Sequence, residues 1–194
     1  MSANELLTEL TESFQNEPHP GELNIVYTNS DFDLEVKQIR ETFKVYTWQE
    51  LPDKLMLYEQ FSLSFLSKKG LRYYLPAFLQ FAVREYTGSD SIPPNLIYNL
   101  TLPAEVDVVQ SAFDTMRYQF STNTSIASQN EYYQTSLRGT DERIHNFIDN
   151  YSQFTYAQGR AILHFLEYMR DEYGGDFFNN EPQVAIERYW FQFA

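Results

Sequence analysis

The most densely apolar part of the chain lies between residues 67 and 86, which read SKKGLRYYLPAFLQFAVREY. Its large apolar side chains recur three or four residues apart, a spacing that places them on one face of an α-helix. Tyr74 and Phe81 widen this face, and so broad a stripe is typical of a helix that is buried on most sides. The segment therefore predicts a helix in the core. Its face consists of Leu71, Leu75, Phe78, Leu79 and Ala82.

Pro76 interrupts this helical pattern. A proline inside a helix lacks an N–H group and its ring clashes with the carbonyl of Arg72, at a cost of ~3 kcal/mol. Either the helix kinks at Pro76, or residues 68–74 form a separate turn and Pro76 opens a new helix. Both alternatives leave the carbonyl of Arg72 without its usual donor, next to Tyr73 and Tyr74.

Arg72, Tyr73 and Tyr74 are therefore the candidate binding residues. They could line a ligand pocket with their polar tips turned inward. Ordinary packing is the favoured alternative, with Tyr74 in the core, Tyr73 at its edge and Arg72 paired with an acid.

Helical spacing and capping residues recur along the rest of the chain. Ser2 with Glu5, and Thr155 with Gln158, have the spacing of a capping box. Gly174-Gly175 is a typical stop after a helix. We predict an all-α fold, one compact domain over residues 1–194 with seven to nine helices. Besides 67–86, the predicted helices cover about 4–15, 33–44, 53–66, 141–151, 156–173 and 181–192, with two more that open at the prolines near 93 and 103.

Two segments depart from the helical pattern. Residues 22–28 (ELNIVYT) alternate in part, but no other stretch offers itself as a strand partner, so we expect an extended arm that lies on the helices. Twelve of the twenty residues from 121 to 140 are Ser, Thr, Asn or Gln, which predicts a long polar loop, mobile at least in part.

Composition excludes several classes of function. The 14 Lys and Arg against 27 Asp and Glu give a formal charge of −13, which argues against binding to the phosphate backbone of nucleic acids. The absence of cysteine excludes disulfides, Cys-ligated zinc, iron–sulfur clusters and thiol catalysis. Residues 1–20 contain no Lys or Arg and no long apolar run, so we expect neither a leader nor membrane association, and we expect a cytoplasmic protein.

Two histidines stand at metal-ligand spacing from a glutamate. Glu142-x-x-His145 has the order found in di-iron carboxylate bundles, whereas His164-x-x-Glu167 has the reverse order. A di-iron site needs two pairs in the same sense and two further inward glutamates. We therefore expect no metal and no cofactor, and we interpret His164 as an interfacial histidine.

The segment at residues 70–79, GLRYYLPAFL, resembles an uncharacterised family of small bacterial proteins. Further similar stretches are IRETF at 39–43 with Trp48, GRAIL at 159–163 with FLEY at 165–168, and IERYW at 186–190. Residues 121–140 look like an enlarged form of a loop that is shorter in this family. The resemblance implies a bacterial, cytosolic, mostly helical protein and no catalytic activity.

Three functions remain open. The first is a non-enzymatic interaction protein that presents an acidic face to a basic protein partner, as immunity proteins do. The second is a small-molecule binder or enzyme with a pocket near Arg72, Tyr73 and Tyr74. The third is a subunit of a homo-oligomer that associates through the aromatic C-terminal segment at 189–193, YWFQF. Clustering of carboxylates on one face would favour the first.

Overall fold

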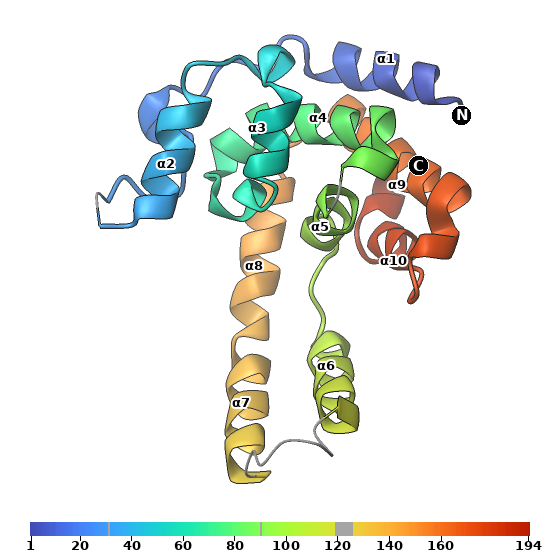
Figure 1. The fold of residues 1–194 in the computed structure, drawn as a ribbon. Coiled ribbons are helices and arrows are strands. Elements are labelled where there is room, and N and C mark those ends of the chain that lie inside the picture. Colours follow the sequence, from blue (N-terminus) through green and yellow to red (C-terminus); the bar gives the residue numbers. More distant parts are fainter. Residues whose placement is uncertain (31, 90, 119–125) are drawn as a thin grey trace. The chain divides into compact units, whose positions relative to one another are not determined.

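The structure is a computed structural model that describes residues 1–30, 32–89, 91–118 and 126–194, except for the side chains of 112–118, 126–129 and 132. Within these ranges every regular element is a helix (Figure 1), which confirms the predicted all-α fold. Contacts divide the chain into two compact units, which are described separately below. The first unit joins Met1–Thr101 to Gln153–Ala194, and the second is Leu102–Ser152. The single domain over 1–194 stays a prediction.

The first unit contains most of the helices. Its α-helices are α1 (Ala3–Phe14), α2 (Leu34–Phe43), α3 (Asp53–Tyr58), α4 (Lys68–Arg84), α5 (Ile92–Asn99), α9 (Tyr156–Tyr173) and α10 (Glu181–Arg188). Short 3-10 helices lie between them, at η1 (Glu22–Asn24), η2 (Trp48–Glu50), η3 (Ser62–Phe65), η4 (Tyr86–Gly88), η6 (Gly174–Asp176) and η7 (Trp190–Phe193).

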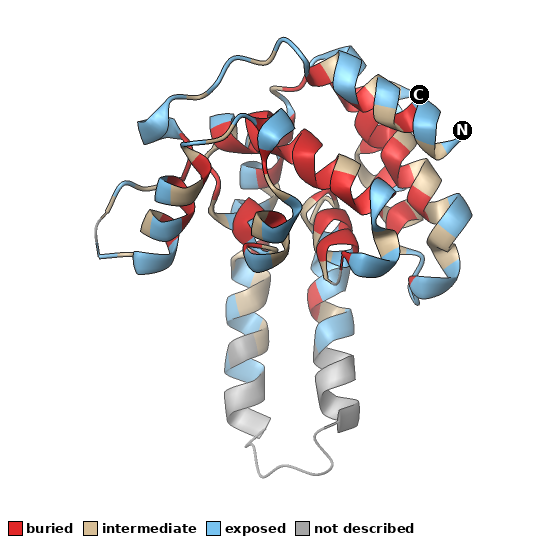
Figure 2. Cartoon of the chain, turned by 45° about the horizontal axis from the view of Figure 1, so that its top comes forward, coloured by how far each residue is buried: buried red, intermediate tan, exposed pale blue. Residues whose placement is uncertain are grey.

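Helix α4 forms the core of the first unit, as the apolar spacing predicts. It contacts α1, α5 and η2, while α9 contacts α1 and α10. Figure 2 shows buried residues along both α4 and α9. The fully buried side chains of α4 are Tyr74, Leu75, Phe78, Leu79 and Ala82.

Pro76 lies inside α4, which runs unbroken from Lys68 to Arg84. The alternative in which residues 68–74 form a separate turn is therefore wrong, whereas a kink at Pro76 stays a prediction. Leu75 and Phe78 are fully buried on either side of it. Each such side chain contributes roughly 1.5–3 kcal/mol, so together they offset the ~3 kcal/mol that an internal proline costs.

The segment expected to be an extended arm, residues 22–28, lies against the start of α4, but its first three residues form the 3-10 helix η1, so the expectation is wrong for Glu22–Asn24. Val26 forms an isolated antiparallel bridge with Leu66, which supplies the partner that the sequence did not reveal. Ser67 N donates to Ile25 O at 2.9 Å. A Cβ at Gly70 would stand 1.9 Å from that same Ile25 oxygen, so only glycine lets the arm approach α4 so closely.

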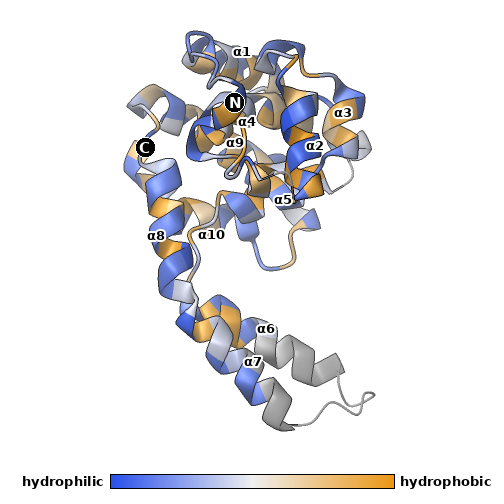
Figure 3. Ribbon diagram, turned by 90° about the vertical axis from the view of Figure 1, so that its left-hand side faces the viewer, coloured by the Kyte–Doolittle hydropathy of each residue, from blue (hydrophilic) through white to orange (hydrophobic). Residues whose placement is uncertain are grey.

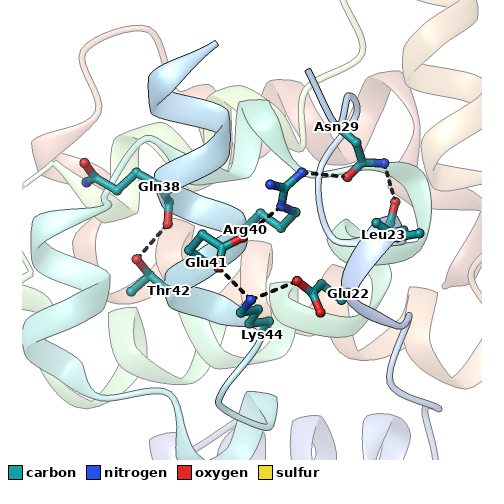
Figure 4. A network of polar contacts seen from close by, with 8 residues as sticks. All are labelled: Glu22, Leu23, Asn29, Gln38, Arg40, Glu41, Thr42 and Lys44. Atoms are coloured by element: carbon teal, nitrogen blue, oxygen red, sulfur yellow. Dashed lines mark hydrogen bonds and ion pairs between the residues drawn. The ribbon is translucent and has the colours of Figure 1, made fainter. Parts of the chain in front are cut away.

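A polar network fastens the arm to α2 (Figure 4). Lys44 Nζ lies 2.8 Å from Glu22 and 2.6 Å from Glu41, and Arg40 Nε lies 3.3 Å from Glu41. Arg40 also donates to Asn29 Oδ1 at 3.2 Å. The carboxylates of Glu22 and Glu41 are thus neutralised by Arg40 of α2 and by Lys44 at its C-terminal end.

The second unit consists of α6 (Glu105–Tyr118), α7 (Ile126–Arg138) and α8 (Thr140–Tyr151), with α6 in contact with α7. Figure 3 shows hydrophobic bands between the hydrophilic turns of α8. Phe147 and Tyr151 of this helix are buried. Over the described residues, with α7 and α8 taken as one helix interrupted at Gly139, the chain has nine α-helices, within the predicted seven to nine.

The polar loop predicted at 121–140 is wrong for residues 126–138, which form α7. The remainder of that segment up to residue 125 lies outside the described residues. Ser, Asn, Gln and Thr each cost less than about 0.7 kcal/mol in a helix relative to Ala, so polar composition indicates contact with water rather than the absence of a helix. The mobility of the segment stays a prediction.

Candidate functional site

Tyr74 is fully buried and its hydroxyl group joins three segments of the first unit. The hydroxyl donates to Phe43 O at 2.9 Å and also lies 3.2 Å from Tyr46 O and 3.3 Å from His19 Nε2. His19 Nδ1 accepts the Gly21 N–H at 3.0 Å. A neutral His19 therefore carries its proton on Nε2 and donates it to the Tyr74 oxygen. Burial raises the pKa of Tyr74, so the phenol stays neutral.

Tyr73 and Arg72 have different partners. Tyr73 packs edge-on against the His19 ring, with centroids 4.9 Å apart, and burial raises its pKa. Arg72 Nε lies 2.8 Å from Glu17 Oε2, which also accepts from Gln158 Nε2 at 3.0 Å. Tyr74 in the core and Arg72 paired with an acid agree with the packing alternative, whereas Tyr73, with only 4% of its surface exposed, is buried and does not lie at the edge of the core. A ligand pocket beside them stays a prediction.

Helix α9 carries a second group of polar residues, which the sequence reasoning identified only in part. Thr155 accepts from Gln158 N and Gln158 accepts from Thr155 N, so the predicted capping box begins the helix. One side of the helix is buried through Ile162, Phe165, Leu166 and Met169. Polar residues at i, i+3, i+4, i+7 and i+8 form a stripe on another side, because these positions share a helix face. They are His164, Glu167, Tyr168, Asp171 and Glu172.

A hollow of about 290 Å³ lies along this stripe, and Met1 completes its lining. We call Met1, His164, Glu167, Tyr168, Asp171 and Glu172 the α9 groove. Three of its side chains are carboxylates. Asp171 and Glu172 are exposed, and Glu167 and Tyr168 are half-buried. The groove therefore carries negative charge on carboxylates that solvent can reach.

The carboxylates of the α9 groove differ in how they are neutralised. Asp171 lies 2.7 Å from Arg170 Nε; this hydrogen bond lowers the pKa of Asp171, and the amino group of Met1 adds a smaller effect in the same direction. In the described part of the chain, Glu167 and Glu172 form no ion pair. The groove therefore holds two carboxylates without a close cationic partner among the described residues, and Arg170 acts on Glu167 only as a nearby charge.

His164 stands at one end of the groove. Its Nδ1 lies 2.6 Å from Glu9 Oε2 on α1, and Arg160 Nε lies 3.3 Å from the other Glu9 oxygen. His164 is thus an interfacial histidine, paired with Glu9 rather than with the Glu167 that stands at metal-ligand spacing. His145 Nδ1 lies 2.7 Å from the backbone oxygen of Asp141.

An aromatic cluster lies next to the groove. The rings of Tyr86 and Tyr173 stack with centroids 3.5 Å apart, and Tyr168 meets Tyr173 edge-on at 6.1 Å. Tyr86 donates to Asp176 Oδ2 at 3.0 Å. Burial, followed by a hydrogen bond to Tyr173, raises the pKa of Tyr168 to about 12. Near neutral pH the ring that lines the groove therefore belongs to an uncharged phenol.

The aromatic C-terminal segment packs within its own unit. Trp190 is fully buried and its Nε1 donates to Leu100 O at 2.7 Å. A Cβ at Gly159 would stand 2.4 Å from the ring of Phe193, so that ring lies directly on α9. Phe191 is 60% exposed. Association of two copies through this segment stays a prediction.

The molecule is thus an acidic, all-helical protein with a solvent-exposed groove along α9. It belongs to the family of unknown function DUF6714, which matches residues 2–114. This match confirms the predicted membership of an uncharacterised family. No curated protein and no solved structure matches the chain. The matched range includes Arg72, Tyr73 and Tyr74, whereas α9 lies beyond it.

None of the helices in the described part of the chain combines the length and the apolar character that crossing a membrane requires.

Proposed function

We propose that this protein is a non-enzymatic interaction protein of the cytoplasm that binds a basic protein partner through the α9 groove. The observation that carries the proposal is the pair Glu167 and Glu172, carboxylates that face one hollow and form no ion pair in the described chain. A cationic side chain from a partner would supply the close ion pair that neither carboxylate forms, since Arg170 acts on Glu167 only as a nearby charge.

The distribution of charge supports this assignment. Carboxylates that connect two segments of the fold form ion pairs, as Glu22 and Glu41 do with Lys44 (Figure 4). Helix α1, which packs on α9, adds the exposed carboxylates of Glu5 and Glu12. Carboxylates gathered on one side steer a cationic partner toward it and repel nucleic acid.

A peptide titration tests the proposal. We expect a decapeptide of alternating Lys and Gly to shift the backbone amide resonances of residues 164–172 in a saturable way, because the groove attracts ammonium groups. Higher salt should weaken binding, since exposed charges are screened over about 10 Å at 0.1 M ionic strength.

Matched variants make the titration decisive. Glu167→Gln with Glu172→Gln removes two groove charges, whereas Glu131→Gln with Glu142→Gln removes two exposed charges from α7 and α8. We expect about two- to thirtyfold weaker binding for the groove variant only, because two exposed pairs are lost at ~0.2–1 kcal/mol each. Equal weakening by both variants, or shifts spread over the whole surface, would show attraction to net charge and not to the groove.

A further inference from the structure

Tyr86 and Tyr173 form the closest parallel stack of rings among the described residues. Their ring centroids lie 3.5 Å apart and the ring planes differ by 7°, whereas aromatic pairs ordinarily have centroids roughly 4.5–7 Å apart. Tyr86 begins η4, just after the end of α4, and Tyr173 is the last residue of α9. Two phenols that are far apart in the chain therefore meet face to face.

Other tyrosine pairs of the described chain have a different geometry. Tyr73 and Tyr74 meet edge-on and are buried, with 4% and 0% of their surface exposed. Tyr168 meets Tyr173 edge-on, with centroids 6.1 Å apart. Tyr86 and Tyr173 are both half-buried, so part of each residue is open to solvent. Among the described residues, only this tyrosine pair combines parallel rings with access for a small oxidant.

A proton acceptor stands beside Tyr86. The hydroxyl of Tyr86 donates to Asp176 Oδ2 at 3.0 Å, and burial, followed by this hydrogen bond, raises the pKa of Tyr86 to about 12. The phenol is therefore protonated near neutral pH and releases its proton when it loses an electron. Asp176 lies within the reach of about 2.6–3.2 Å over which a side chain accepts a proton. This contact favours Tyr86 as the first phenol to be oxidised.

We propose that Tyr86 and Tyr173 are a modification site, at which a one-electron oxidant joins the two rings as dityrosine. Two equivalents of the oxidant, a ferryl haem or a Ru(III) complex, each accept one electron, so that each phenol loses one. The phenolic proton of Tyr86 passes to Asp176 and that of Tyr173 passes to water.

The stack supplies the proximity that the coupling needs. Reacting atoms held about 3–3.5 Å apart combine far faster than the same groups do in free solution, and the two ring centroids are 3.5 Å apart. A C–C bond forms between the two ring carbons next to the hydroxyl-bearing carbons. The hydrogen on each of these carbons then passes as a proton to the oxygen of its own ring, which restores both phenols. The chain loses two electrons and two protons in all.

The new bond ties η4, at the end of α4, to the end of α9. A covalent bond between distant residues lowers the conformational entropy of the unfolded chain. The oxidised monomer should therefore unfold at a higher urea concentration than the unmodified protein. One-electron oxidation would thus turn a ring stack into a covalent brace of the first unit.

Photo-oxidation of dilute protein with tris(bipyridine)ruthenium(II) and persulfate tests the proposal, because light and persulfate generate the Ru(III) oxidant. We expect a monomer with dityrosine fluorescence and a mass lower by two hydrogen atoms. Fragmentation of its cross-linked peptide should place the bond between Tyr86 and Tyr173. Absence of dityrosine, dityrosine confined to covalent dimers, or an intramolecular bond between other tyrosines would each overturn the proposal.

Matched variants assign the bond to this pair. Tyr86→Phe and Tyr173→Phe each keep the ring and remove one phenol, so both the intramolecular bond and the higher urea midpoint should be lost. Tyr98→Phe removes a tyrosine that is 76% exposed and should leave both unchanged. Asp176→Asn removes the proton acceptor and should lower the yield of the bond at equal light dose. An intramolecular bond that survives Tyr173→Phe would overturn the proposal, and an unchanged yield in Asp176→Asn would overturn the role of Asp176.

Discussion

Glu9 on α1 and His164 on α9 are joined by a contact of 2.6 Å between a carboxylate oxygen and Nδ1. Both side chains are mostly buried, with 17% and 26% of their surface exposed. The contact lies where α1 packs on α9 and brings the acidic α1 to one end of the α9 groove. It links the packing of two helices that are far apart in sequence to the position of the candidate site.

A double-mutant cycle on Glu9 and His164 should reveal their coupling. We expect Glu9→Gln and His164→Ala to destabilise the fold individually, with an interaction free energy of about 0.5–1 kcal/mol between them. Urea unfolding of the four proteins measures it. Strictly additive effects would mean that the pair contributes no net stability.

Gly70→Ala should destabilise the protein by about 1–3 kcal/mol, because the new methyl group would overlap Ile25 O, a backbone atom that cannot move without breaking the bridge. Gly174→Ala is the matched control, since its Cβ would meet nothing within 4 Å. We expect the control to change the free energy of unfolding by less than about 0.5 kcal/mol. Similar losses for the two variants would contradict the close approach of the arm to α4.

Gly159→Ala should displace the C-terminal segment, since its methyl group would overlap the ring of Phe193. Here the obstacle is a side chain, so removing the ring should relieve the clash. We predict that Gly159→Ala costs less stability in a Phe193→Ala background than in the wild type. Thermal unfolding of the single and double variants tests this, and an undiminished cost would place the ring elsewhere.

The tyrosines beside the groove predict sensitivity to alkali. Tyr86 and Tyr168 each have a pKa of about 12 in the folded chain, with burial as the main cause, against about 10 for an unfolded tyrosine. Between these pH values the unfolded state binds fewer protons than the folded state, so the free energy of unfolding falls as pH rises. Their contribution is complete below about pH 10 and is lost as pH rises through the folded pKa.

Urea unfolding across this alkaline range measures the effect. Tyr168→Phe removes one ionisable group and should flatten the decline in stability relative to the wild type. A decline of the same slope in both proteins would show that Tyr168 is not protected from ionisation.

Local signals in the sequence predicted much of the fold. The capping boxes at Ser2 and Thr155 form as expected, and α9 spans Tyr156–Tyr173, the predicted 156–173. Such signals operate within one or two helical turns, so a single sequence displays them. The polar composition of residues 126–138 predicts a loop, but these residues form α7, because Ser, Thr, Asn and Gln cost little in a solvent-exposed helix.

Contacts between segments that are far apart in the chain could not be predicted from the sequence. The bridge of Val26 with Leu66 and the contact of Glu9 with His164 depend on how the helices pack, which no local pattern encodes. In the α9 groove this limit applies only to Met1, because the other lining residues lie on one helix. The spacing of His164 and Glu167 is that of a metal motif, but it is also the start of a helical polar stripe that continues through Tyr168 and Glu172.

Cross-linking of partners in extracts of the cells that make the protein, followed by mass spectrometry, tests the central claim most directly. We predict that the wild type and the variant with Glu131→Gln and Glu142→Gln capture the same partner protein. Cross-links should join an Arg-rich or Lys-rich segment of this partner to α9. The variant with Glu167→Gln and Glu172→Gln should no longer capture the partner. A partner held equally by the groove variant, or cross-linked away from α9, would contradict the assignment of the groove as the binding site.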